Sequence, residues 1–483
     1  MSLTNQNAIQ YEHSLDHHVE FFSKAGSLYD TDGRNDFYGN GEDILKLFQQ
    51  AWIVDKKLSF LLLLWLRDPR GGAGNRSGFR KCIKWVANNS PEWIEKNINL
   101  ISEYGRWDDL RCLFDTKAND VAVNYWTAAL LDKNILAAKW AKRTDIPLYL
   151  QLKDMFAVKN IGDFRRLLSG IRSGKIVETK MCDKKWNEIE YKSVPSVAMA
   201  RYTNAFNKHD EDRFSVYKES LKSGNTTINA NVLFPHDCKK TAVRGDSEIA
   251  DAQFDALPNY MQNENIMTIC DSSGSMTSLV TNTVTAYDVS TSLALYCSGK
   301  LPKDNPFYKK FIQFCNESKF TNWEGHKFSE AVPSSNFMEE DKFFDGAIGT
   351  TRIDKALDLI LNTGKIFKVS NDNMPSMLLI LSDMQFHTGC EGNDLTITLT
   401  EVERSLRKWD DAGYKRPQIV YWNLVPYSGQ PDTVDSKDVA LVSGFSPAIL
   451  KSILSCDDFS PKAVMLETLE KYVDSVFIPI STE

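Results

Sequence analysis

Two short apolar runs in the second half of the chain lead into polar loops that contain an aspartate. Ile266–Cys270 is followed directly by Asp271, and Ser376–Leu381 is followed by Ser382 and Asp383. Segments of helical character lie between and after these runs. Strands that alternate with helices indicate βαβ units and a mostly parallel sheet. Because ligands bind at the carboxyl ends of strands in such sheets, both aspartates are candidates for one site.

The alternation extends over residues 256–483, which we predict to be one α/β, Rossmann-like domain. Apolar runs indicate further strands near residues 311–314 and 417–424. Amphipathic spacing predicts helices at 287–297, 353–361, 399–408 and 461–473.

Three loops of this domain offer carboxylate and hydroxyl oxygens. The candidate ligands are Asp271, Ser273 and Ser275, Thr351 or its neighbour Thr350, and Asp383. A hard cation such as Mg²⁺ prefers oxygen ligands in octahedral geometry and usually retains water. The pattern therefore predicts a divalent cation, most simply Mg²⁺, as the cofactor. No base-activated nucleophile accompanies it, so we do not expect an enzyme.

This constellation resembles the metal-ion-dependent adhesion site of von Willebrand factor A (vWA) domains, where an Asp-x-Ser-x-Ser loop is followed by a threonine and then an aspartate. The register of the helix 353–357 favours Thr351 over Thr350. The resemblance implies direct coordination by the hydroxyls, coordination largely through water by the aspartates, and an open position for a partner's carboxylate or phosphate. Arg352 departs from the family pattern and is expected to bring a positive charge near the metal.

Residues 1–255 are predicted to form a separate all-helical domain. Ile44, Leu47, Phe48 and Ala51 follow the stripe of an amphipathic helix. Further helices are expected at 56–67, 76–88, 91–102, 120–131, 133–142, 161–173 and 195–207. Helices of this length joined by short turns indicate stacked pairs, as in HEAT-like repeats, although no exact internal repeat occurs. The polar segment from about residue 236 is the expected linker.

Four segments of the chain, 66–76, 104–110, 177–182 and 194–199, resemble a family of uncharacterised vWA-containing proteins of plants, fungi and viruses. The resemblance extends from about residue 40 to residue 470. That family is in turn similar to the TROVE-domain proteins, the Ro autoantigen group, in which helical repeats form a ring that a vWA domain closes. The resemblance implies such a ring, and small non-coding or single-stranded RNA as the partner.

Two basic groups in the helical half are compatible with an RNA partner. The first comprises Arg67, Arg70, Arg76, Arg80, Lys81 and Lys84, and the second comprises Arg165, Arg166, Arg172 and Lys175. Such side chains neutralise phosphates and give salt-dependent affinity. A solvated helix face with ordinary ion pairs explains the same residues.

The charge is distributed unevenly along the chain. Residues 1–255 contain 37 Lys and Arg against 34 Asp and Glu, whereas residues 256–483 contain 20 against 30, which gives the total of −7. An acidic total argues against a protein coated with nucleic acid, but it permits a basic face on the helical half.

Nine cysteines without a Cys-x-x-Cys pair indicate free thiols in a reducing compartment, the cytoplasm. The longest apolar stretch, 58–66, is far shorter than the ~20 residues that cross a bilayer, and no signal peptide is evident. The resemblance to the Ro group and the basic residues of the helical half lead us to expect a non-enzymatic RNA-binding scaffold for small or misfolded RNA. The alternative is a metal-dependent protein-interaction scaffold or a viral assembly component, in which the adhesion site holds a partner's acidic side chain.

Overall fold

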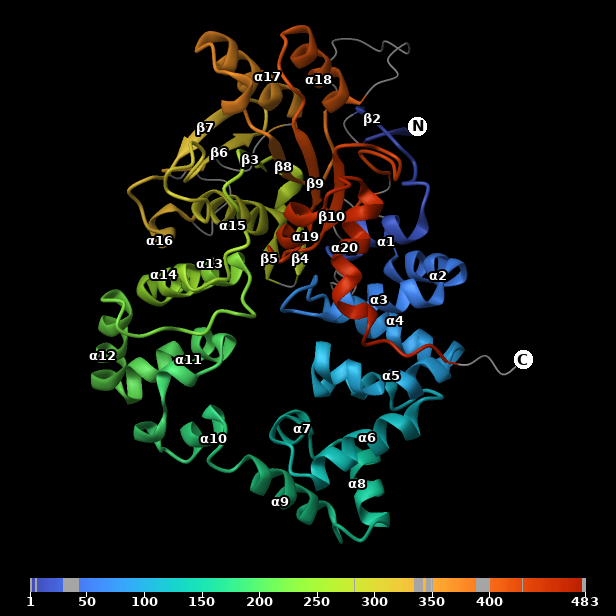
Figure 1. Ribbon diagram of the computed structural model, residues 1–483. Helices are drawn as coiled ribbons and strands as arrows, with labels where there is room; N and C mark the ends of the chain where they lie inside the picture. The colour runs from blue at the N-terminus through green and yellow to red at the C-terminus, as the bar shows by residue number, and fades with distance from the viewer. Residues whose placement is uncertain are drawn as a thin grey trace.

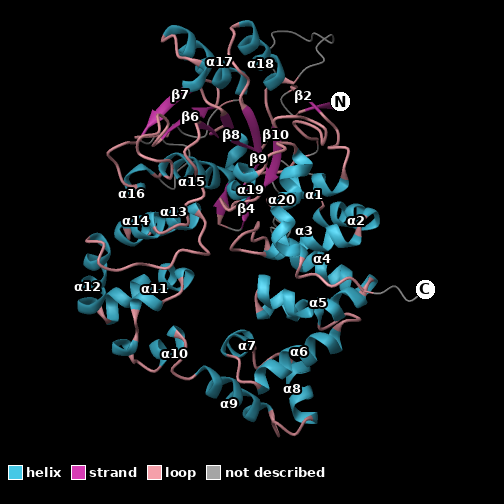
Figure 2. Ribbon diagram, in the orientation of Figure 1, coloured by secondary structure: helices cyan, strands magenta, loops and turns pink. Residues whose placement is uncertain are grey.

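A computed structural model shows the arrangement of the chain. It describes residues 2–4, 7–28, 43–281, 283–333, 342–344, 349, 351–387, 400–427 and 429–479. Figures 1 and 2 show a mixed α/β domain and an arc of helices that leaves this domain at α3 (Lys56–Arg67) and returns to it at α13 (Pro235–Val243). The predicted organisation, a helical N-terminal region with a C-terminal α/β region, is confirmed.

The α/β domain is built on a six-stranded sheet of order β10-β9-β8-β3-β6-β7. The strands are β3 (Ile266–Asp271), β6 (Lys310–Phe314), β7 (Ser318–Asn322), β8 (Met377–Ser382), β9 (Gln418–Asn423) and β10 (Val439–Ser443). Every neighbouring pair is parallel except β6 and β7, which are antiparallel. The mostly parallel sheet is thus confirmed, and β3 and β8 are fully buried neighbours within it.

Several elements of this domain were not predicted from the sequence. They include β7, β10 and a small antiparallel hairpin formed by β4 (Leu279–Thr281) and β5 (Val284–Thr285). The helices of the domain are α15 (Ala286–Gly299), α16 (Phe328–Ala331), α17 (Ile353–Ile366), α18 (Glu401–Asp411), α19 (Ile449–Ser455) and α20 (Pro461–Val473). Of these, α15 packs on β3, β6 and β8, and α17 packs on β6 and β7.

The N-terminal segment packs against the α/β domain, although the two are far apart in sequence. Strands β1 (Ser2–Leu3) and β2 (Ile9–Gln10) form a short pair, and α1 (His17–Ala25) lies against β10. The backbone N–H of Gly26 donates to the Ser443 hydroxyl at 2.9 Å. That hydroxyl donates to the Phe22 carbonyl at 2.6 Å. These buried bonds attach the N-terminus to the sheet.

The arc is a succession of short helices, most of which touch the next one along the chain. They are α2 (Ile44–Val54), α3, α4 (Arg76–Asn89), α5 (Pro91–Tyr104), α6 (Asn119–Leu131), α7 (Ile135–Trp140), α8 (Ile146–Asp154), α9 (Ile161–Arg172), α10 (Val177–Cys182), α11 (Ser196–His209), α12 (Glu211–Lys222), α13 and α14 (Ser247–Asp255). The arc is anchored to the α/β domain at both ends, because α3 packs on α20 and α13 packs on α15.

The segment that we expected to be a linker, from about residue 236, contains α13 and α14 and is therefore folded. Its composition is polar, but each helix buries a few apolar side chains, among them Cys238, Ile249 and Phe254. These contacts stabilise the helices, because amphipathic packing contributes more to helix stability than propensity does. No helix within the described ranges has both the length and the apolar character of a membrane span.

Candidate functional site

The carboxylates of Asp271 and Asp383 lie at the same edge of the sheet. Asp271 ends β3 and Asp383 follows the neighbouring strand β8, and both side chains are fully buried. The Ser273 N–H donates to Asp271 Oδ1 at 2.8 Å, and the Ser382 hydroxyl donates to Oδ2 at 2.5 Å. The Gln385 N–H donates to Asp383 Oδ1 at 3.0 Å. These bonds fix both carboxylates on rigid strand ends.

The serines of the first loop lie beside these carboxylates. The Oγ atoms of Ser273 and Ser275 are 3.1 Å apart. Ser273 is fully buried, whereas Ser275 is half-buried.

Two buried carboxylates without a cation are electrostatically unfavourable. Burial raises the pKa of Asp271, and the charge of Asp383 raises it further. Burial also raises the pKa of Asp383, although the Ser275 hydroxyl and the Gln385 N–H oppose this rise. Even so, Oδ2 of Asp383 is buried and makes no hydrogen bond of normal geometry with a described residue. Such a site is relieved by a proton or by a bound cation.

The loop that carries Thr351 meets the other two loops. The Gly274 N–H donates to the Gly349 carbonyl at 3.3 Å, and the Thr351 carbonyl accepts from the His387 N–H at 2.8 Å. Thr351 is fully buried, whereas Thr350 lies outside the described residues. The structure thus brings the loops of all five predicted ligands together.

Within the described ranges no three His, Cys, Asp or Glu side chains are placed to hold a metal ion, so a cation here would rely on two carboxylates, hydroxyls and water.

The guanidinium of Arg352 is paired with an aspartate of its own segment, whereas we expected it to bring a positive charge near the metal. Its Nε and Nη2 atoms donate to the Asp354 carboxylate at 2.9 and 2.7 Å. In the described structure it forms no ion pair with Asp271 or Asp383. Asp354 neutralises the guanidinium at the start of α17, so Arg352 does not take the place of a cation.

A second candidate site is a cavity of about 530 Å³ between the start of the helical arc and the β4–β5 hairpin. Its charged and hydroxyl-bearing lining residues are Arg67, Arg70, Arg76, Ser77, Arg106, Thr281 and Thr283. Val197 and Val232 complete the wall. We call this space the arginine cavity. Figure 1 shows the hairpin reaching toward the turn between α3 and α4.

Two aspartates beneath the arginine cavity compensate part of its charge. Asp109 is fully buried and accepts from Arg67 Nε and Arg80 Nε, each at 2.7 Å. Asp108 pairs with Arg80 at 2.9 Å and with Arg106 at 3.0 Å. Three guanidinium groups therefore share two carboxylates, and the cluster keeps a net positive charge.

Arg70 and Arg76 add uncompensated charge to the cavity. Both are exposed, and neither forms an ion pair with a described residue. Burial lowers the pKa of Arg106, and the positive charges of Arg76 and Arg67 lower it further. Crowded cations that lack carboxylate partners form a site for an anion, and a guanidinium pairs with phosphate through two parallel hydrogen bonds.

The glycine-rich turn between α3 and α4 has a packing role. A Cβ atom on Gly72 would lie 2.0 Å from the Trp65 carbonyl oxygen, and Gly74 has a φ of 71°. The turn closes tightly on the end of α3, so its glycines are explained by close backbone approach.

The other basic residues of α4 lie outside the cavity lining. Arg80 is held by the two aspartates, Lys81 Nζ pairs with Asp43 at 2.8 Å, and Lys84 is exposed.

The second basic group lies on and after α9, away from the arginine cavity. Arg165 and Lys175 are exposed. Arg166 pairs with Asp163 at 2.5 Å, and Arg172 Nε donates to a main-chain carbonyl at 3.0 Å. The cavity residues that the two predicted basic groups do not include are Arg106 and the threonines of the unpredicted hairpin, Thr281 and Thr283.

Comparison with known proteins gives matches over most of the chain. Residues 265–475 and 154–275 match two domains of unknown function, DUF7788 and DUF2828. An uncharacterised protein of Acanthamoeba polyphaga mimivirus is 24% identical over 508 residues, which cover 91% of this chain and 84% of that protein. The crystal structure of the Ro (RSR) protein of Deinococcus radiodurans aligns with 89% of this chain and 86% of its own, at 12% identity and a TM-score of 0.35.

A Ro protein is thus a structural neighbour of this chain, but a TM-score of 0.35 is too low to establish a shared fold. The two matching domain descriptions name neither a vWA nor a TROVE domain. Membership of those families stays a prediction.

Proposed function

We propose that the protein is a non-enzymatic scaffold that binds single-stranded RNA at the arginine cavity. The observation that carries this proposal is the pair Arg70 and Arg76, which line the cavity beside Arg67 and Arg106 and lack carboxylate partners in the described structure. Positively charged grooves bind single strands through their backbone phosphates.

The other walls of the cavity suit a nucleotide. Thr281 and Thr283 offer hydroxyls that can bind a ribose or a phosphate, and Val197 and Val232 offer an apolar surface for a base. A volume of about 530 Å³ is that of a small-molecule site. A cavity of this size suits single nucleotides of a strand rather than a double helix. HEAT-like repeats remain our proposal for the arc, supported by the contacts between consecutive helices from α2 to α6.

The test is binding of a fluorescein-labelled uridine decamer, followed by fluorescence anisotropy over a range of salt concentrations. We expect low-micromolar or tighter affinity at low salt. In a plot of the logarithm of the association constant against the logarithm of the salt concentration, the slope should be about −0.7 for each phosphate contacted. The RNA should be recovered intact after incubation with Mg²⁺. Absence of binding at low salt, or shortened RNA, would contradict the proposal.

We further propose that Asp271, Ser273, Ser275, Thr351 and Asp383 hold a divalent cation, for which Mg²⁺ is the best fit, in a vWA-like domain. Two buried carboxylates, one with an oxygen that lacks a normal hydrogen bond, support this assignment. When bound, the cation would supply an open coordination position for a carboxylate. This favours a second function, metal-dependent capture of a protein partner that presents an acidic side chain.

Substitution of Asp271 by asparagine should abolish saturable binding of Mg²⁺, measured by isothermal titration calorimetry, because the neutral amide removes one of only two charged ligands. Asp383→Asn should have the same effect. Asp304→Asn, at an exposed position of the same domain, is the matched control and should bind as the wild type does. RNA affinity should not change in the Asp271 variant. Retained binding by both site variants would rule out the assignment.

A further inference from the structure

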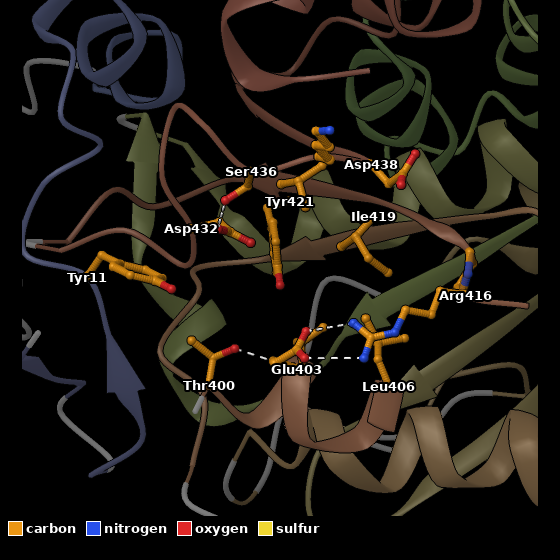
Figure 3. Close-up of a pocket in the computed structure, with 14 residues that line it drawn as sticks. Tyr11, Thr400, Glu403, Leu406, Arg416, Ile419, Tyr421, Asp432, Ser436 and Asp438 are labelled. Carbon is orange, nitrogen blue, oxygen red and sulfur yellow. Dashed lines mark hydrogen bonds and ion pairs between the residues drawn. The ribbon is translucent and has the colours of Figure 1, made fainter. Parts of the chain in front are cut away.

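A third cavity, of about 490 Å³, lies between β9, α18 and the loop that precedes β10 (Figure 3). Tyr11 from the N-terminal segment completes it. The Tyr11 N–H donates to the Gln430 carbonyl at 2.8 Å, and the Gln430 N–H donates to the Tyr11 carbonyl at 2.7 Å. This backbone pair holds the phenol at the cavity wall. We call the space the Tyr–Asp cavity; it shares no lining residue with the arginine cavity.

Two phenols enter the Tyr–Asp cavity without a hydrogen-bond partner. Tyr421 on β9 is only 3% exposed, and its hydroxyl points into the cavity (Figure 3). Neither this hydroxyl nor that of Tyr11 forms a hydrogen bond with a described residue. Burial raises the pKa of Tyr421 well above its ordinary range, and the charges of Asp432 and Glu403 raise it further, so the group stays protonated. A buried phenol normally has a partner, and here a ligand can supply it.

The carboxylates of the cavity leave a negative charge. Asp432 accepts a hydrogen bond from the Ser436 hydroxyl and one from a main-chain N–H at 2.9 Å, but it pairs with no cation among the described residues. Glu403 pairs with Arg416 at 2.9 Å and with Arg407 at 3.5 Å, and Arg416 also binds Asp410 at 2.6 Å. Glu403 and Asp410 are thus neutralised by two guanidiniums, whereas Asp432 has no cationic partner among the described residues.

Lys437 also lines the cavity, but its side chain is exposed and forms no ion pair with Asp432 in the described part of the chain. The charge of Asp432 is therefore available to a ligand.

Another part of the wall is aliphatic. Val402 and Leu406 of α18, Ile419 of β9 and Val439 of β10 are all buried and line the cavity. A bare metal ion would leave this surface and most of the volume unused. An organic cation with an aliphatic arm uses the charge, the phenols and the apolar wall together.

We propose that the Tyr–Asp cavity binds a primary alkylammonium group, with its nitrogen between Asp432 and Tyr421 and its alkyl chain along Leu406 and Ile419. A free aliphatic amine and a lysine side chain share this chemistry. The nitrogen donates to the Asp432 carboxylate and to the phenol oxygens, while the chain covers the aliphatic wall.

The test is isothermal titration calorimetry of the full-length protein with n-pentylamine and with 1-pentanol, which has the same chain without the charge. Pentylamine should bind saturably and pentanol should not. Equal binding of the two, or no heat with pentylamine at millimolar concentration, overturns the proposal. A capped Gly-Lys-Gly peptide forms a second arm. Tighter binding of the peptide identifies a lysine side chain as the source of the bound ammonium group, and tighter binding of pentylamine identifies a free amine as that source.

Variants locate the binding site. Asp432→Asn should weaken pentylamine binding roughly tenfold, because the neutral amide cannot form a charge-assisted hydrogen bond with the ammonium group. Tyr421→Phe is nearly isosteric and should weaken binding severalfold. Asp435→Asn, at an exposed position of the same loop, is the matched control. Wild-type affinity in both cavity variants would contradict the assignment.

Discussion

Replacing Arg70 and Arg76 together by alanine should weaken binding of the uridine decamer roughly a hundredfold at low salt. Each guanidinium is exposed to the cavity and has no carboxylate partner in the described structure, so each is free to bind a phosphate. A charge-assisted hydrogen bond contributes about 1.5–3 kcal/mol, and about 1.4 kcal/mol corresponds to a tenfold change in affinity. The slope of the logarithm of the association constant against the logarithm of the salt concentration should also become shallower, by about 0.7 for each phosphate that the variant no longer binds.

The matched control is Arg165→Ala, since Arg165 is equally exposed but lies on α9, outside the arginine cavity. Its variant should bind RNA within about twofold of the wild type if the cavity is the site. The stability of all three proteins should agree within about 0.5 kcal/mol, as for other exposed positions. An equal loss of affinity in the Arg165 variant would assign RNA binding to a diffuse basic surface.

Asp109→Ala should lower the free energy of unfolding by about 3–5 kcal/mol, because removing one member of a buried ion pair leaves an uncompensated buried charge. Asp109 is fully buried, and Arg67, which donates to it, is 4% exposed. The same carboxylate accepts hydrogen bonds from Arg80 and from the Arg106 N–H. The substitution therefore also removes the bonds that hold Arg67 and Arg106 at the wall of the arginine cavity. Urea denaturation followed by circular dichroism measures the change.

The control for this substitution is Asp115→Ala, an exposed aspartate a few residues along the chain. Its effect should stay within about 0.5 kcal/mol. If the Asp109 variant were as stable as the control, the buried pair would not organise this part of the arc. A less stable Asp109 variant should also bind RNA more weakly at temperatures where it remains folded.

The loops of the proposed metal site could be predicted because local sequence marks strand ends. The apolar runs before Asp271 and Asp383 identify two strands, and parallel neighbours bring their carboxyl ends to one edge of the sheet. The place of the Arg352 guanidinium could not be predicted in this way. It depends on a side-chain ion pair with Asp354, which the spacing permits but does not require.

Features made by distant segments were missed for a different reason. Tyr11 and Asp432 lie at opposite ends of the chain, and the packing of the N-terminal segment on the α/β domain, which includes the pairing of Tyr11 with Gln430, brings them together. The return of the arc to the α/β domain likewise depends on the packing of α13 against α15. Hydrophobic periodicity reports the local element and the face that it buries, but not the partner of that face.

The most direct test of RNA binding at the arginine cavity is photo-crosslinking of a uridine decamer that contains 4-thiouridine, followed by mass spectrometry of the crosslinked peptides. We predict crosslinks to the α3–α4 turn, residues 69–77, or to the β4–β5 hairpin, residues 279–285, because both border the cavity. The Arg70→Ala, Arg76→Ala protein should lose them. Crosslinks confined to other parts of the chain, or unchanged in that variant, would contradict the assignment of the cavity as the RNA site.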